Sequence, residues 1–327
     1  MSKCKSSKKE SADGISNVTD SLTKLYIRKK DVFASAFNYF LYGGKEVIHP
    51  EQLQEVNTNG VVVPYGEDGT EIRLQPVQKI RDAFLSVMTD ERRIFMLCGI
   101  ENQTLMHNAM PVRNGLYDFM EYAAQVREAA DAHRKAGNYG KDRVDFLSGF
   151  HSTDKLIPVY TLVIYWGAGE WTAPRSLFEM PDINGENDYY GLNDWKINLI
   201  IPSEITEEEA LEKFGSDLGK ALIYIKNMGN PEEEERIYKD ERFWILNTET
   251  ALVLNEIMNA NFKIERKEMV TDMCYAVERW KKDATISSAI DTARRYRIKE
   301  DAILADIMKQ FDLTEEEANE YMTKKSA

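Results

Sequence analysis

Residues 95–103, FMLCGIENQ, contain the pattern from which the fold of this chain can be argued. The stretch begins with an apolar run that is typical of a buried strand. It ends with Glu101 and Gln103, which are two residues apart and would therefore point to the same face of a strand. A hydrophobic strand that ends by presenting a carboxylate and an amide on one face raises the question of what these side chains bind.

A segment upstream is expected to pair with this strand. Residues 78–88, QKIRDAFLSVM, are separated from residues 94–103 by the turn sequence TDERR. In an antiparallel hairpin the start of the first strand lies beside the end of the second, so Asp82 is expected to lie close to Glu101 and Gln103. Two neighbouring carboxylates repel each other unless a cation lies between them, and removal of one is expected to relieve that repulsion.

A divalent metal ion is the usual partner of two such carboxylates. Mg²⁺ takes oxygen ligands from one or two carboxylates and keeps positions for water and for phosphate oxygens. Gln103 would then position the attacking water or a phosphate oxygen. The spacing also fits a simpler interpretation, in which Asp82 pairs with Arg81 or Arg113 and Glu101 merely ends a strand.

The remaining patterns predict an α/β domain. Apolar residues at helical spacing predict a helix within residues 25–43, and residues 112–136 predict a long helix with Pro111 near its first turn. The continuous apolar run at residues 159–167 is typical of a central buried strand, and residues 195–202 predict a further strand. Strands that alternate with helices in this way indicate a central sheet with helices around it.

The two ends of the chain differ from this central part. Residues 1–22 are polar and rich in Ser and Lys, which predicts a disordered tail. Helical patterns begin at Thr206, which forms a capping-box sequence with Glu209, and they continue at residues 240–259 and 267–284. We therefore expect an α/β domain at residues 23–205, followed by a helical region at residues 206–327.

Composition narrows the function classes. The 327 residues are 43% hydrophobic and 30% charged, as in soluble globular proteins. The net charge of −13 argues against a non-specific nucleic-acid coat protein, but it leaves room for an enzyme that meets DNA through a local basic patch. Basic residues cluster at residues 24–30, where solvated surface charge is the simpler interpretation.

The sequence also bears on the compartment. No apolar run reaches the roughly 18 residues of a membrane span, and the N-terminus lacks the apolar segment of a secretory signal. The three cysteines, Cys4, Cys98 and Cys274, are scattered, which predicts neither a disulfide framework nor a cysteine metal site. A reducing cytoplasm is the expected location, and no membrane partner is expected.

Several segments around the hairpin resemble a known family when they are taken together. These segments are RDAFLSVM at residues 81–88, IFMLCGIENQTLMHNAMPVRNGLYDFMEYAAQV at residues 94–126, and DFLSGFHSTDKLIPVYTLVIYWGAGEWTAPRSLFEMP at residues 145–181. The combination resembles the Rpn family of recombination-promoting nucleases, also described as YhgA-like transposases of the PD-(D/E)XK nuclease superfamily. The resemblance covers about residues 26–203 and continues more loosely into the helical region.

The resemblance implies a restriction-endonuclease-like core, which is a mixed central sheet flanked by helices with a metal site at the end of a β-hairpin. Asp82 stands for the aspartate of the motif, Glu101 for its second acid and Gln103 for its lysine. The proline that normally precedes the aspartate is absent, because Arg81 stands there. The backbone carbonyl of Asn102 is implied as a further metal ligand, beside the carboxylates of Asp82 and Glu101.

The implied activity is Mg²⁺- or Mn²⁺-dependent hydrolysis of DNA phosphodiester bonds, linked to recombination or mobile elements. Gln103 removes the cation that a lysine would supply, so more of the transition-state stabilisation must come from the metal or from Arg113. The alternative is a catalytically weak or inactive protein that keeps the nuclease fold in order to bind DNA or protein. The helical region would then serve as a partner surface or as the contact of a homodimer.

One acidic residue, Asp31, and one basic residue, Arg113, are auxiliary candidates for the site. Asp31 in the opening helix matches an acid that this fold often places there, although it also suits the start of a helix as a dipole-favoured charge. Arg113 opens the long helix beside the site, where it would bind the scissile phosphate or form an ion pair with Asp82 or Asp118.

Two residues of the long helix are further candidates. Tyr122 and Gln125 share a helix face, and the resemblance implies contacts of such residues near the DNA backbone. The simpler interpretation places Tyr122 in the core and Gln125 on the surface. His107 lies in a loop after the motif and is expected to be a hydrogen-bonded loop residue, and Cys98 is expected in the core.

Overall fold

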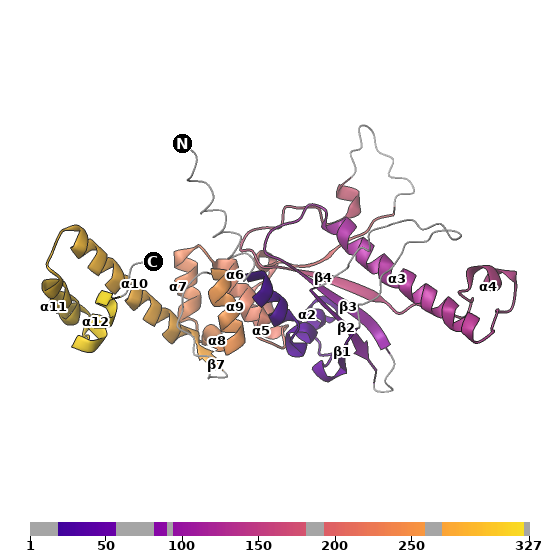
Figure 1. Ribbon diagram of the computed structural model, residues 1–327, viewed down its shortest axis with the longest axis horizontal. Coiled ribbons are helices and arrows are strands. Elements are labelled where there is room, and N and C mark those ends of the chain that lie inside the picture. Colours follow the sequence, from indigo (N-terminus) through magenta and orange to yellow (C-terminus); the bar gives the residue numbers. More distant parts are fainter. Residues whose placement is uncertain (1–18, 57–81, 90–93, 181–192, 259–269, 324–327) are drawn as a thin grey trace. The chain divides into compact units, whose positions relative to one another are not determined.

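The computed structural model describes residues 19–56, 82–89, 94–180, 193–258 and 270–323 (Figure 1). The chain forms two compact units, Met1–Gly229 and Asn230–Ala327. The first unit extends past residue 205 and includes two further helices. The domain boundary that the sequence predicts after residue 205 stays a prediction. Residues 1–18 of the predicted tail lie outside the described residues, while residues 19–27 are helical.

The first unit is built on a mixed five-stranded sheet with the strand order β1-β2-β3-β4-β5. The neighbours β1, β2 and β3 pair antiparallel, whereas β3, β4 and β5 pair parallel. The predicted α/β class and the predicted hairpin of residues 78–88 with 94–103 are confirmed where the strands are described. The strands are β1 Leu53–Glu55, β2 Ala83–Met88, β3 Ile94–Gln103, β4 Val159–Tyr165 and β5 Asn198–Ile200.

The two central strands are buried, as their apolar sequences predict. Every residue of β4 except Tyr160 is buried, and β3 is buried from Met96 to Asn102. A strand in the middle of a sheet with helices on both faces has no solvated side, which is why its sequence reads as one apolar run. The strand predicted at residues 195–202 is shorter than expected, because Pro202 begins a 3-10 turn at Pro202–Glu204.

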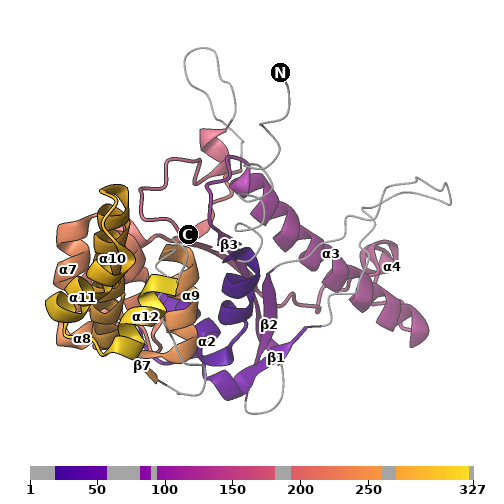
Figure 2. The same ribbon diagram turned by 60° about the vertical axis from the view of Figure 1, so that its left-hand side comes forward.

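Helices α2 (Lys30–Tyr42) and α3 (Met110–Lys135) cover opposite faces of this sheet (Figure 2). On one face, burial and the neighbouring Tyr160 and Cys98 raise the pKa of Tyr42 at the end of α2. On the other face, the hydroxyl of Thr161 donates a hydrogen bond of 2.5 Å to Asp118 of α3. Because Tyr160 and Thr161 are consecutive in β4, these contacts place the two helices on opposite sides of the sheet.

The ends of both helices have the residues that their positions favour. Gly43 follows α2 with φ of 62°, and its N–H bonds to the carbonyls of Asn38 and Tyr39. Pro111 occupies the first turn of α3, where no helical partner for its missing N–H is needed. The first unit also contains α4 (Arg143–Ser148), α5 (Glu207–Glu212), α6 (Leu218–Asn227) and the 3-10 turns η1 (Pro50–Gln52), η2 (Leu177–Glu179) and η3 (Pro202–Glu204).

The capping box expected at the start of α5 is present. The side chain of Thr206 accepts the N–H of Glu209 at 3.1 Å, and the carboxylate of Glu209 accepts the N–H of Thr206 at 3.2 Å. The two contacts satisfy backbone groups that the first turn of a helix leaves without a partner.

The second unit is mainly helical, as expected, but each of two predicted helical segments contains a short strand. Ile245–Asn247 and Val270–Asp272 pair as the antiparallel strands β6 and β7. The helical prediction is wrong there because pairing between distant segments outweighs local helical character. The helices are α7 Pro231–Lys239, α8 Glu241–Trp244, α9 Thr248–Met258, α10 Met273–Arg295, α11 Glu300–Phe311 and α12 Glu315–Thr323.

The second unit has a core of its own. It consists of Ile286, Ile290, Ile303, Ile307 and Ala318, which join α10, α11 and α12 and are at most 2% exposed. Within the ranges that the structure describes, no helix combines the length and the apolar character that a membrane crossing requires.

Candidate functional site

The hairpin of β2 and β3 brings Asp82 to the end of β3. Ala83 pairs with Ile100, so the residue before Ala83 falls opposite Glu101. The carboxylate oxygen Oδ2 of Asp82 accepts the backbone N–H of Asn102 at 2.8 Å. Asp82 is 7% exposed, and its position at the end of the hairpin agrees with the strand-pairing argument from the sequence.

The backbone of Asn102 faces Asp82 as well. In a strand, the N–H and C=O of one residue point to the same neighbouring strand, so the Asn102 carbonyl lies on the Asp82 side of β3. The alternation continues at Gln103, whose carbonyl accepts the N–H of Trp166 at 2.8 Å on the β4 side. The amide oxygen of Asn102 accepts the indole N–H of Trp166 at 2.8 Å, which holds this side chain away from the carboxylates.

Glu101 is completely buried and forms an ion pair with Arg113. Nη2 of Arg113 lies 2.8 Å from Oε2 of Glu101, and Nε of Arg113 donates to the hydroxyl of Tyr117 at 3.0 Å. Burial lowers the pKa of Arg113, but Glu101, Tyr117 and Asp82 more than offset this effect, so its pKa is raised overall. The start of α3 therefore supplies a permanent positive charge to the buried carboxylate.

Lys24 is the residue of the site that the sequence interpretation missed. Its Nζ lies 3.2 Å from Oδ1 of Asp82 and 2.5 Å from Oδ2 of Asp20. Four residues further along, just after this helical segment ends at residue 27, Nε of Arg28 donates to the backbone carbonyl of Asp82 at 2.8 Å. The spacing of Lys24 and Arg28 was an available signal, because residues four apart share one helix face.

Asp20 and Asp82 together stabilise the positive charge of Lys24. Burial lowers its pKa, but the hydrogen bonds and charges of Asp20 and Asp82 outweigh burial, so its pKa is raised overall. Each of the two acids thus has its own cation, Lys24 for Asp82 and Arg113 for Glu101. The simpler interpretation, in which Arg113 pairs with Asp82, names the wrong acid, and Arg81 lies outside the described residues.

The oxygen atoms of this cluster that could ligate a metal ion suit a hard divalent cation. The Asp82 carboxylate, the Glu101 carboxylate and the Asn102 carbonyl all belong to the end of one hairpin, and all three are oxygen ligands of the kind that Mg²⁺ and Mn²⁺ prefer. A metal ion at this place would share the carboxylates with Lys24 and Arg113 or displace these cations. The residues therefore fit a metal, although each acid is already neutralised by a side chain.

The other predicted residues near the motif lie as follows. Gln103 ends β3, is partly exposed and points to the same face as Glu101. Asp31 is exposed in the first turn of α2, and no hydrogen bond or ion pair joins it to the described residues of the cluster. His107 is an exposed loop residue that accepts the N–H of Ala109, and Cys98 is fully buried, as expected.

Tyr122 and Gln125 are not brought to this cluster. The hydroxyl of Tyr122 accepts the N–H of Val159 at 3.0 Å, and the amide of Gln125 bonds the backbone of Ile157 at 2.7 and 3.1 Å. Val159 begins β4, whereas Glu101 pairs with Val163 further along that strand. Both side chains therefore use their polar atoms to hold the chain as it enters β4.

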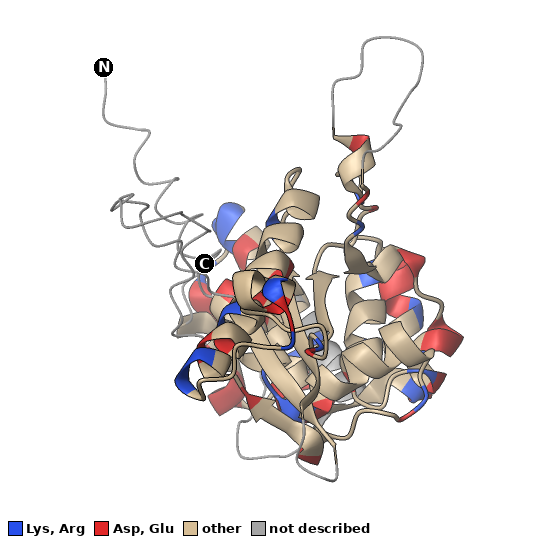
Figure 3. Ribbon diagram, turned by 90° about the vertical axis from the view of Figure 1, so that its right-hand side faces the viewer, with Lys and Arg blue, Asp and Glu red and all other residues tan. Residues whose placement is uncertain are grey.

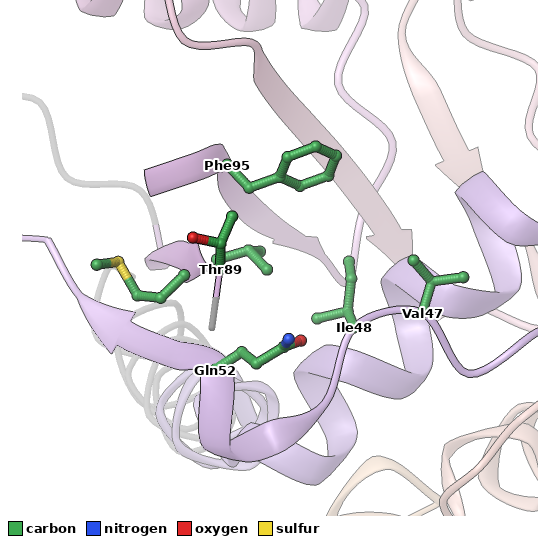
Figure 4. A pocket seen from close by; sticks show the side chains of 7 residues that line it. Val47, Ile48, Gln52, Thr89 and Phe95 are labelled. Atoms are coloured by element: carbon green, nitrogen blue, oxygen red, sulfur yellow. The ribbon is translucent and has the colours of Figure 1, made fainter. Parts of the chain in front are cut away.

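A cavity of about 220 Å³ lies at the opposite end of the hairpin (Figure 4). It is lined by Val47, Ile48, Gln52, Val87, Met88, Thr89 and Phe95. None of these side chains is ionisable at neutral pH, and Met88 pairs with Ile94 at the end remote from Asp82. The cavity is therefore separate from the cluster of charged residues.

Charges elsewhere do not form one dominant patch on the face that Figure 3 presents. Basic and acidic positions are interspersed along the helices seen there (Figure 3).

Comparisons with protein families, with curated proteins and with solved structures found no match to this chain. The chemistry of the chain is therefore argued from the geometry of the cluster itself.

Proposed function

We propose that this chain is a Mg²⁺- or Mn²⁺-dependent DNA endonuclease of the type that its resemblance to the Rpn family implies. The observation that carries the proposal is the strand register, which places Asp82 opposite Glu101 at the end of one hairpin, with the Asp82 carboxylate hydrogen-bonded to the backbone of Asn102. Both acids are less than 10% exposed. Acids at the end of a hairpin, in a mixed sheet with helices on both faces, are the arrangement that the resemblance implies for such a metal site.

Each residue of the cluster would have a separate role in the reaction. Asp82, Glu101 and the Asn102 carbonyl would hold the ion, which when bound activates a water and stabilises charge on the reacting phosphate. Gln103, on the same face as Glu101, would orient the water or a phosphate oxygen. Arg113, whose Nη2 lies 2.8 Å from Oε2 of the buried Glu101, adds positive charge to the cluster from the start of α3.

Lys24 supports this division of roles. The motif that the chain resembles has a lysine where Gln103 stands at the end of β3, and Lys24 brings an ammonium group to the same cluster from the helical segment at residues 19–27. Positive charge that is preorganised beside a reacting phosphate stabilises the charge that develops in the transition state. Lys24 and Arg28 would also begin the local basic patch that an acidic protein needs to approach DNA.

One observation favours a second candidate, a nuclease-fold protein that binds DNA or protein without cutting. Lys24 and Arg113 neutralise the two acids without a metal ion, and Gln103 carries no charge. A cluster whose negative charges are already neutralised by basic side chains gains less free energy from binding a metal ion. In this second candidate the helical unit at residues 230–327 would provide the partner surface.

A plasmid-nicking assay with Mg²⁺, Mn²⁺ or Ca²⁺ tests the proposed activity. The wild type, Asp82→Asn, Glu101→Gln and the control Glu128→Gln, which changes an exposed acid of α3, would be compared. We expect cleavage with Mg²⁺ or Mn²⁺ by the wild type and the control, and a loss of at least about a hundredfold in the two site variants. Equal cleavage by all four proteins would show that the site assignment is wrong.

Metal titration then separates an enzyme from a binding protein. Calorimetry with Mn²⁺ should give a binding signal in the wild type that disappears in Asp82→Asn. If a folded wild type neither binds Mn²⁺ at millimolar concentration nor cleaves DNA, the second candidate is favoured. The isosteric variants are preferred to alanine because Glu101 is fully buried and its truncation would leave a cavity.

A further inference from the structure

A second cluster of ligating side chains lies at the other end of α3. His133 belongs to the last turn of this helix, and His151 and Asp154 belong to the segment between α4 and β4. We propose that His133, His151 and Asp154 bind one transition-metal ion of the zinc class. This inference does not rest on the proposed nuclease activity, because it uses other residues and another class of metal.

The geometry of the three side chains is close to that of a metal site. One ligand atom from each residue lies within 4.8 Å of the other two. Nε2 of His133 lies 2.9 Å and 3.1 Å from the two carboxylate oxygens of Asp154. Two imidazoles and one carboxylate are a common zinc ligand set, and a tetrahedral site with bonds of about 2.1 Å separates its ligand atoms by about 3.4 Å. Small side-chain movements would therefore bring the three ligand atoms to one ion.

The two rings would have to move when the metal binds. The imidazoles of His133 and His151 are stacked, with ring centroids 3.7 Å apart and ring planes 13° from parallel. A ring nitrogen binds metal through a lone pair in the plane of the ring, so two parallel rings cannot both point at one ion. The rings therefore tilt out of the stack on binding, and this change is an observable of its own.

The segment that carries His151 and Asp154 is already held in place. The carboxylate of Asp154 accepts the N–H of His151 at 2.7 Å, and the N–H of Asp154 bonds back to the carbonyl of His151 at 2.9 Å. Asp145 of α4 accepts the N–H of Ser152 at 2.9 Å. Because these hydrogen bonds already fix the backbone, the main entropic cost of metal binding would be the ordering of side chains. His151 itself is only 6% exposed.

A glycine allows this segment to approach α3. Gly149 has φ of 66°, and a Cβ atom at this position would lie 2.9 Å from the Cβ of Ala130. The close approach places the following residues beside His133, which is one turn further along the helix than Ala130. A metal ion here would join the end of α3 to the segment that enters β4, with one tetrahedral position left for water.

The two candidate metal sites are far enough apart to be tested independently. Arg113 and His133 lie about 20 residues apart on α3, which corresponds to about 30 Å along the helix. Imidazole nitrogen favours zinc, whereas the all-oxygen cluster at Asp82 and Glu101 favours Mg²⁺ or Mn²⁺. A variant in one cluster should therefore leave the other unaffected.

The test is a competitive Zn²⁺ titration of the full-length chain, without an affinity tag, against a chromophoric chelator. The wild type would be compared with His133→Gln and His151→Gln, and with His107→Gln, a change of an exposed loop residue, as the control. We expect the wild type to bind Zn²⁺ and both cluster variants to lose at least about tenfold in affinity, since even outer residues of metal sites contribute 10–100-fold. His107→Gln should bind as the wild type does, and excess Mg²⁺ should not displace the Zn²⁺.

A second readout follows the ring geometry directly. Imidazole proton NMR signals of His133 and His151 should shift when Zn²⁺ is added, because the stacked rings separate, while those of His107 should not. His133 is partly exposed, so His133→Gln keeps the test valid if a change at the buried His151 disturbs folding. The proposal is overturned if folded wild type binds no Zn²⁺, or if His133→Gln binds it as tightly as the wild type.

Discussion

At the scale of single residues, the charge balance of the candidate nuclease site depends on Lys24 and Arg113. Sequence spacing predicts that Asp82 and Glu101 repel each other and that removal of one relieves the repulsion. The structure changes this expectation, because each acid has a basic partner within about 3 Å. Removal of either acid then breaks an ion pair, and removal of a base leaves negative charge in a buried place.

The first prediction concerns Arg113→Gln. Glu101 is fully buried, and loss of the guanidinium 2.8 Å away should lower the free energy of unfolding by about 3 kcal/mol. Urea denaturation without metal measures this, with the exposed Arg127→Gln of the same helix as the control. Mg²⁺ should restore part of the loss if the carboxylates bind metal. A variant as stable as the control would contradict the importance of this ion pair.

At the scale of elements, α3 connects three regions of the first unit. Its start carries Arg113 at the carboxylate cluster, its middle holds the beginning of β4 through Tyr122 and Gln125, and its end carries His133. The resemblance implies a DNA contact for Tyr122 and Gln125, and this stays a prediction. The hydrogen bonds of both side chains go to the backbone of residues 157–159 and hold the chain where it enters β4.

The second prediction follows from the middle of α3. Tyr122→Phe removes the acceptor of the Val159 N–H and keeps the ring in its apolar surroundings. The free energy of unfolding should fall by about 1–2 kcal/mol, because a partly buried N–H loses its partner. Thermal or urea unfolding measures the stability, and a fluorescence assay measures DNA affinity. A variant with unchanged stability but weaker DNA binding would instead favour the DNA contact.

At the scale of the whole molecule, the two units have separate cores. The sheet of the first unit buries Leu162 in its central strand, and the second unit buries Ile307 between three helices. Each core is built from residues of its own unit. A change in one core is therefore expected to act mainly on the unit that contains it.

The third prediction uses one truncation in each core. Leu162→Ala and Ile307→Ala should each lower the stability of one unit by about 2–5 kcal/mol. Differential scanning calorimetry of the full chain should then resolve two transitions, of which a different one moves in each variant. A single transition that moves equally in both variants would show that the units unfold together.

The sequence by itself determined the features that depend on neighbouring residues along the chain. The apolar runs of β3 and β4, the turn between β2 and β3, the proline at the start of α3 and the capping box of α5 are all local patterns. From them followed the α/β class and the meeting of Asp82 with the end of β3. Local periodicity failed at β6 and β7, because their pairing depends on a segment more than twenty residues away.

Only the tertiary structure decided which distant side chains meet. Lys24 reaches Asp82, Arg113 reaches Glu101, and His133 stacks on His151, and each contact joins separate elements. Spacing along the chain does not determine which partner each of these side chains meets, since the contacts depend on how helices pack on the two faces of the sheet. The sequence therefore places acids at the end of the hairpin, while packing determines the cations that neutralise them.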